Sequence, residues 1–281
     1  MPPVTGEQLR AFVDRYQTDT GSSPTPVWRA YFAACTLLRH HLGQARLDAQ
    51  VMGLEERRSP FLIPRPETEL DRARHLQRVT ALGEALFNLQ AVPGFDGQAR
   101  RLRTEDLESV AAELDSATLL HGHAGVPIRF VPPAGAAGSD YDIDAVIGPH
   151  TAACETKCKV AATECDERTV YHSLEQARKQ LPKGRPGVVL LKLPEHWLRS
   201  AEMDRSLAAA LERKFRQTGR VSAVVAHCEE WDATPDHFAR LLVARTAHNP
   251  NADVPLGEFG DLVPDRFRSP HWQSLNELMN P

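Results

Sequence analysis

The first part of the chain has the hydrophobic spacing of α-helices. Between Leu9 and Tyr16 apolar residues recur every three to four positions, and Thr5 with Gln8 before them fits a helix capping box. Thr25 precedes a proline, a pair that favours the start of a second helix because proline suits the first helical position. We therefore expect a helical N-terminal region with three helices, which end near residues 16, 42 and 89. The third of these is expected to start near Pro66, after a linker at 59–66.

From Thr104 onward the pattern changes to helix-like segments that alternate with strand-like ones. Thr104 is expected to cap a helix that ends near Gly122–Gly125. Apolar runs bounded by Gly or Pro predict strands, and two of the runs are continuous, as in buried strands. The expected elements are strands at 126–131, 141–147 and 152–160, a helix at 170–181, a strand at 187–193, a helix at 206–217 and a strand at 221–227. This order is α-β-β-β-α-β followed by α-β.

A loop at Ala91–Gly97, rich in turn-forming residues, is the expected boundary between the two parts. The chain is therefore divided into a helical region at 1–97 and an α/β domain at 98–281. Within the second part, 238–245 is a candidate strand, whereas 249–270 is rich in Pro, Gly and Asp and is expected to be irregular. The C-terminal tail of the α/β domain is therefore predicted to have the least regular structure.

Composition narrows the class of protein. Hydrophobic residues make up 42% and charged residues 25%, values typical of a globular chain. The net charge of -4 means that contact with a polyanion would need a local basic patch. The five cysteines form no regular framework, which favours a reducing compartment, and the N-terminus lacks an apolar signal core. The apolar stretch Ala30–Leu38 is too short to span a bilayer. We expect a soluble cytoplasmic protein that makes no membrane contact.

The candidate chemistry lies between residues 139 and 159, where charged residues occupy alternate positions of two expected strands. Side chains alternate between the faces of a strand, so residues two apart share a face. A turn at 148–150 would fold the two strands into a hairpin and bring their charged faces together. The residues on those faces are Asp140, Asp142 and Asp144 on the first strand, and Glu155, Lys157 and Lys159 on the second.

Such a cluster is suited to metal-dependent phosphodiester hydrolysis. Carboxylates held close together are costly unless a cation neutralises them, and hard oxygen ligands suit Mg²⁺ or Mn²⁺. A bound metal can polarise a phosphoryl oxygen and lower the pKa of a water molecule. A nearby lysine such as Lys157 can position that water and stabilise charge on phosphorus. Asp142 is expected to face Glu155 across the hairpin, with Asp144 as the alternative.

The segment resembles the active-site hairpin of the PD-(D/E)xK, or restriction-endonuclease-like, superfamily of nucleases. The resemblance rests on Asp142, on Glu155-Thr156-Lys157 and on the α-β-β-β-α-β order between Thr104 and His227. It implies a core with a central mixed sheet, a Mg²⁺ or Mn²⁺ cofactor, and metal binding by Asp142 and Glu155. Lys157 would orient the attacking water.

The same resemblance implies further residues. A glutamate from the preceding helix often joins the metal site, which points to Glu113 as a ligand. A polar residue from the helix after the third strand often joins the catalytic group, which points to Gln180, with Gln176 as the second candidate. The basic residues that would contact nucleic acid, DNA before RNA, are Lys159, Arg178, Lys179 and Lys183.

The sequence therefore predicts a divalent-metal-dependent nuclease, with a DNA endonuclease as the first expectation. The alternative is a non-catalytic protein that keeps the nuclease fold to bind nucleic acid or to act as a scaffold. A small-molecule enzyme has no support from a P-loop or a Gly-x-Gly-x-x-Gly motif. The helical N-terminal region could bind substrate, form a homodimer or recruit a partner protein, and its sequence leaves these roles open.

Overall fold

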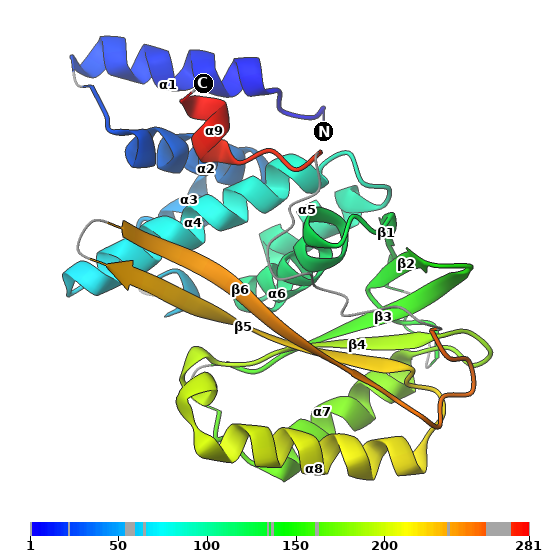
Figure 1. The fold of residues 1–281 in the computed structure, drawn as a ribbon. Helices are drawn as coiled ribbons and strands as arrows, with labels where there is room; N and C mark the ends of the chain where they lie inside the picture. The colour runs from blue at the N-terminus through cyan, green and yellow to red at the C-terminus, as the bar shows by residue number, and fades with distance from the viewer. Residues whose placement is uncertain are drawn as a thin grey trace. The chain divides into compact units, whose positions relative to one another are not determined.

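A computed structural model describes residues 2–21, 23–53, 60–63, 66–133, 135, 138–160, 163–234, 237–256 and 271–280 (Figure 1). Contacts within the chain group it into two compact units. Unit 1 comprises Met1–Leu114, Asp232–Arg240 and Pro270–Pro281, and unit 2 comprises Asp115–Trp231 and Leu241–Ser269. The expected linker at 59–66 and the expected irregular segment at 249–270 lie partly outside the described residues.

Unit 1 is helical and is organised around α2. This helix spans Pro26–Leu42. It contacts α1 (Gly6–Thr20), α3 (Gln44–Gln50), α4 (Glu69–Leu89), α5 (Phe95–Thr104) and α9 (Leu275–Met279). The predicted capping box at Thr5 is confirmed, because its hydroxyl accepts a hydrogen bond from the amide of Gln8 at 3.2 Å. Thr68 and Asp71 form a second box, so α4 begins three residues later than expected.

The prediction that Thr104 caps α6 (Leu107–Ala117) is wrong. Thr104 is the last residue of α5, and the side chain of Asp106 accepts the hydrogen bond from the amide of Ser109 at 2.9 Å. Aspartate is a stronger N-cap than threonine, which explains the later start. A π-helical segment, η2 (Thr118–His123), continues α6 to the region where the sequence predicted its end.

Unit 2 contains most of a mixed sheet whose described strands follow the order β1-β2-β3-β4-β5-β6. The pairs β1–β2 and β2–β3 are antiparallel, and β3–β4 and β4–β5 are parallel. The predicted α/β class with a mixed sheet is therefore confirmed. The strands are β1 (Ile128–Phe130), β2 (Ile143–Ile147), β3 (His150–Cys158), β4 (Gly187–Lys192), β5 (Ala223–Thr234) and β6 (His237–His248).

The end of the chain is more regular than the sequence indicated. β5 extends seven residues past its expected end at His227, and β6 confirms and lengthens the candidate strand at 238–245. The short helix α9 was not expected, because five residues give too few repeats for a hydrophobic pattern to be recognised. Within the part of the chain that the structure describes, none of the helices has the length and apolar character needed to cross a membrane.

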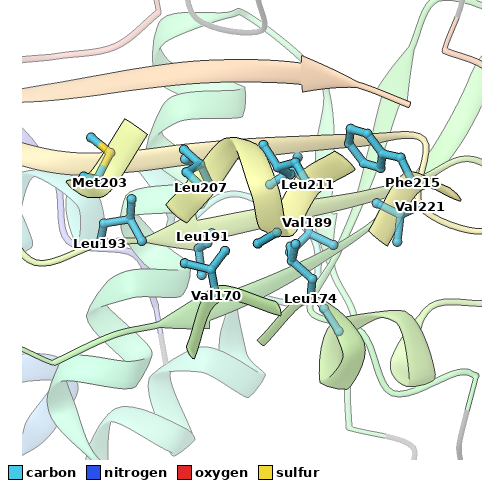
Figure 2. Close-up of a cluster of buried hydrophobic side chains, with 14 of the residues drawn as sticks. Val170, Leu174, Val189, Leu191, Leu193, Met203, Leu207, Leu211, Phe215 and Val221 are labelled. Atoms are coloured by element: carbon cyan, nitrogen blue, oxygen red, sulfur yellow. The ribbon is translucent and has the colours of Figure 1, made fainter. Parts of the chain in front are cut away.

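Two helices cover one face of the sheet, α7 (Glu167–Gln180) and α8 (Ala201–Gln217). Their apolar sides meet Val189 and Leu191 of β4, all of them within one buried cluster (Figure 2). Full burial of a side chain such as Leu174 or Leu191 contributes about 1.5–3 kcal/mol relative to exposure. This core fixes β3 and α7 against each other, and both elements carry residues of the candidate site.

Candidate functional site

A tight turn at the β2–β3 hairpin aligns two acidic positions. Gly148, within the turn, has a φ of 55°, a left-handed conformation that favours glycine. The paired register ends with Ile143 opposite Cys154, and Asp142 and Glu155 are the next residues along the two chain segments. The amide of Asp142 donates to the carbonyl oxygen of Cys154 at 3.1 Å, which holds Asp142 against β3 just beyond the last paired residue.

The backbone holds Asp142 from both sides. Its carboxylate oxygen Oδ2 accepts a hydrogen bond from the amide of Thr156 at 2.7 Å, and its carbonyl oxygen accepts one from the amide of Val131 at 2.8 Å. The first contact directs the carboxylate toward β3, where Glu155 precedes Thr156. Asp142 itself lies one residue before β2, at the mouth of the hairpin.

Lys157 connects Glu155 with α7. Its Nζ atom lies 2.6 Å from Glu155 Oε1 and donates a hydrogen bond to Gln180 Oε1 at 2.5 Å. The amide nitrogen of Gln180 donates to the carbonyl oxygen of Asp140 at 3.1 Å. The side chain of Glu155 is 2% exposed and that of Lys157 is 21% exposed, so the ammonium group stands between a buried carboxylate and the surface. The structure thus brings together four predicted residues: Asp142, Glu155, Lys157 and Gln180.

The two alternatives at this site lie in different surroundings. Gln176, the second candidate on α7, is exposed. Asp144 is buried, and both of its carboxylate oxygens are engaged, Oδ2 by Arg129 at 2.5 Å and Oδ1 by Arg185 at 2.5 Å. Tyr141 also donates to Oδ1, at 3.0 Å. Burial raises the pKa of Asp144, but these hydrogen bonds outweigh burial and hold the pKa below its usual value. The engagement favours Asp142 as the acidic partner of Glu155.

Glu113, the expected third carboxylate, belongs to unit 1. Arg101 binds both of its oxygens, with nitrogen–oxygen distances of 2.5 and 2.7 Å, and Gln98 donates a further hydrogen bond at 2.9 Å. A bidentate arginine–carboxylate pair is among the stronger polar contacts in proteins. Glu113 therefore has a defined role within its own unit, and its part in a metal site stays a prediction.

The expected nucleic-acid contacts differ in accessibility. Lys179 and Lys183 are exposed, whereas Arg178 is ion-paired with Glu175 at 2.7 Å. Lys159 is partly buried, and burial lowers its pKa below the usual value, with the charge of Lys157 acting in the same direction. Of these residues, Lys179 and Lys183 are the most available to a ligand in solution.

Sequence reasoning missed three features of this region. It did not anticipate Arg129, the backbone contact from Thr156, or the link from Tyr141 to Arg185. Arg129 lies directly opposite Asp144 in the β1–β2 register. A basic residue in one strand and an acidic one in the next is a weak signal by itself, because only the register shows that the two residues meet.

No protein-family model, curated protein or solved structure matches the chain. Within the described residues, no group of three or more His, Cys, Asp or Glu side chains is arranged to hold a metal ion. The functional reading therefore depends on the chemistry of Asp142, Glu155, Lys157 and Gln180.

Proposed function

We propose that this protein is a divalent-metal-dependent nuclease that hydrolyses phosphodiester bonds, with DNA as its substrate. One arrangement supports the proposal above all: the amide of Thr156, the residue after Glu155, holds the carboxylate of Asp142, and Lys157 lies 2.6 Å from Glu155. Two carboxylates and one ammonium group leave one net negative charge, which favours a cation next to a group that can stabilise an anion.

The donor set fits Mg²⁺. This ion binds hard oxygen ligands, and proteins commonly hold it through one or two carboxylates, with water and substrate phosphate completing the shell. Asp142 and Glu155 supply two such carboxylates, and the hydrogen bond from the Thr156 amide restrains the first of them. Two protein carboxylates are therefore enough for such a site, and a third acidic or histidine side chain is not required.

Each residue of the cluster then has a distinct role. Asp142 and Glu155 would hold the metal, which when bound polarises the phosphoryl oxygen and lowers the pKa of water. Lys157 directs its ammonium group at the attacking water and stabilises the charge that develops on phosphorus. Gln180 restrains Lys157 through its 2.5 Å hydrogen bond, and the Thr156 amide fixes the carboxylate of Asp142.

The strand order supports this reading. The antiparallel strands β1, β2 and β3 are followed by α7 and by β4 parallel to β3, which is the arrangement implied by the α-β-β-β-α-β order of restriction-endonuclease-like nucleases. That the protein belongs to this superfamily of nucleases is part of the proposal.

Cleavage of plasmid DNA and of single-stranded DNA and RNA, with Mg²⁺, with Mn²⁺ and with excess EDTA, tests the proposal. We expect cleavage with either metal, none with EDTA, and none by Glu155→Ala once circular dichroism has shown that the variant is folded. Equal cleavage by the Glu155→Ala variant would indicate a contaminating nuclease. Absence of cleavage by the wild-type protein with every metal would overturn the proposal and leave a non-catalytic nucleic-acid-binding or scaffold protein.

A further inference from the structure

Next to the candidate site lies a second charged group, on the same face of the sheet. Asp144 pairs with Ala153 of β3, and Ala153 lies two residues before Glu155 in the same strand, so Asp144 and Glu155 share a face and are separated by about 7 Å along the strand direction. Asp144 pairs across β1–β2 with Arg129, and its second oxygen accepts a hydrogen bond from Arg185. The acidic residue next to the proposed metal site is thus surrounded by two guanidinium groups.

The two arginines are held in different ways. Arg185 uses all three of its nitrogens within the protein: Nε donates to the carbonyl oxygen of Thr151 at 3.0 Å, Nη1 to Tyr141 at 2.9 Å and Nη2 to Asp144 at 2.5 Å. Its guanidinium also lies over the ring of Tyr141, 5.3 Å from the centroid. Arg129 contacts Asp144 through Nη2, and 64% of its side chain is exposed.

The charges in this group do not cancel. Two guanidinium groups share one carboxylate, so one net positive charge remains. Because Arg185 is buried more deeply and fully engaged, that charge is presented to solvent by Arg129. Asp144 in turn limits the motion of Arg129, which reduces the entropy lost when its remaining N–H groups bind an anion.

We propose that Arg129, held by Asp144, which is itself held by Arg185, forms a phosphate-binding subsite for the nucleic-acid backbone, next to the phosphodiester that is cut. This inference rests on the proposed function and names a substrate contact that the sequence did not predict. Arginine suits the role because its planar group can donate two hydrogen bonds to one phosphate. Asp144 acts here as a positioning residue and would not serve as a metal ligand.

Binding of a fluorescein-labelled DNA oligonucleotide, measured by anisotropy in EDTA at several salt concentrations, tests the subsite without cleavage. Arg129→Ala should weaken binding about tenfold, since it removes a charge-assisted contact. The slope of log affinity against log salt should also fall by about one unit. Arg129→Lys should retain part of the affinity. Arg205→Ala is the matched control, because Arg205 is an exposed arginine in a surface pair with Glu202 at 2.6 Å.

The outcomes separate the subsite from the proposed function. If wild-type protein binds and cuts DNA while Arg129→Ala binds with unchanged affinity and salt slope, the subsite is overturned and the nuclease stands. If Arg129→Ala weakens binding but wild-type protein cuts nothing, the subsite stands as part of a binding protein. If wild-type protein neither binds nor cuts nucleic acid, both are overturned.

Discussion

The tripeptide Glu-x-Lys occurs twice in this chain, once in β3 and once in α8. In β3, Glu155 and Lys157 share a face and their charged groups meet at 2.6 Å. In α8, Glu212 pairs with Arg216 at 3.1 Å, while Lys214 turns inward and pairs with Glu175 of α7. Residues two apart share a face in a strand but not in a helix, so one tripeptide yields two unrelated arrangements.

The two lysines also differ in access to water. Lys157 is 21% exposed and Lys214 is 2% exposed and lies over the ring of Tyr171. An ion pair that excludes water contributes to packing and has no room for a substrate. The proposed function gives the β3 lysine a part in the chemistry, whereas the contacts of the α8 lysine indicate a part in stability, and both roles can be tested.

The largest expected effect is on cleavage by Lys157→Ala. Loss of the ammonium group removes its stabilisation of charge on phosphorus, so the cleavage rate should fall by about 100- to 1,000-fold. Single-turnover cleavage with saturating protein measures the change. Lys214→Met, corrected for its folded fraction, should cut within about twofold of wild type because the surface at β3 is unchanged. Equal losses in both variants would contradict the comparison.

The next effect is on stability. Lys214→Met leaves the carboxylate of Glu175 with one fewer partner and should lower the free energy of unfolding by about 2 kcal/mol. Urea denaturation followed by circular dichroism measures it. Lys179→Met is the control: Lys179 lies 4.0 Å from the same carboxylate but is 64% exposed. Its substitution should cost less than about 0.5 kcal/mol, and a similar cost for both would mean that burial of Lys214 is irrelevant.

The pair of Lys214 and Glu175 should also give the protein a pH-dependent stability. Hydrogen bonds from Arg178, followed by that from Lys214, lower the pKa of Glu175 from 4.5 to about 2. Because the pKa is lower in the folded protein, the stabilisation is complete above about pH 4.5 and is lost as the pH falls toward 2. The stability difference between wild type and Glu175→Gln should therefore shrink between pH 6 and pH 2.5. A difference independent of pH would show that Glu175 is not stabilised as an anion.

The smallest effect concerns the orientation of Lys157. Gln180→Ala should lower kcat about tenfold with KM little changed, because Gln180 holds the lysine and does not bind the substrate. Gln180→Glu keeps an oxygen acceptor and should restore part of the rate. Gln176→Ala, one turn away on the exposed side of α7, should have no effect. An equal loss in Gln176→Ala would remove the distinction between the two glutamines.

Hydrophobic periodicity predicted the strands around the site to within a few residues. It succeeded because β4 is a continuous apolar run and the β2–β3 hairpin turns at a glycine followed by proline. By contrast, the engagement of Asp144 by Arg129 and Arg185 depends on side chains from three strand regions, which no local pattern connects.

Metal binding by aspartate variants tests the central claim most directly. Mn²⁺ binding, followed by electron paramagnetic resonance in the full-length protein, can be compared among wild type, Asp142→Asn, Glu155→Gln and Asp144→Asn. The account predicts that the substitutions at 142 and 155 each weaken Mn²⁺ binding by about tenfold or more, through loss of a charged ligand, whereas Asp144→Asn binds as the wild type does. Unchanged binding in Asp142→Asn, or a loss confined to Asp144→Asn, would contradict it.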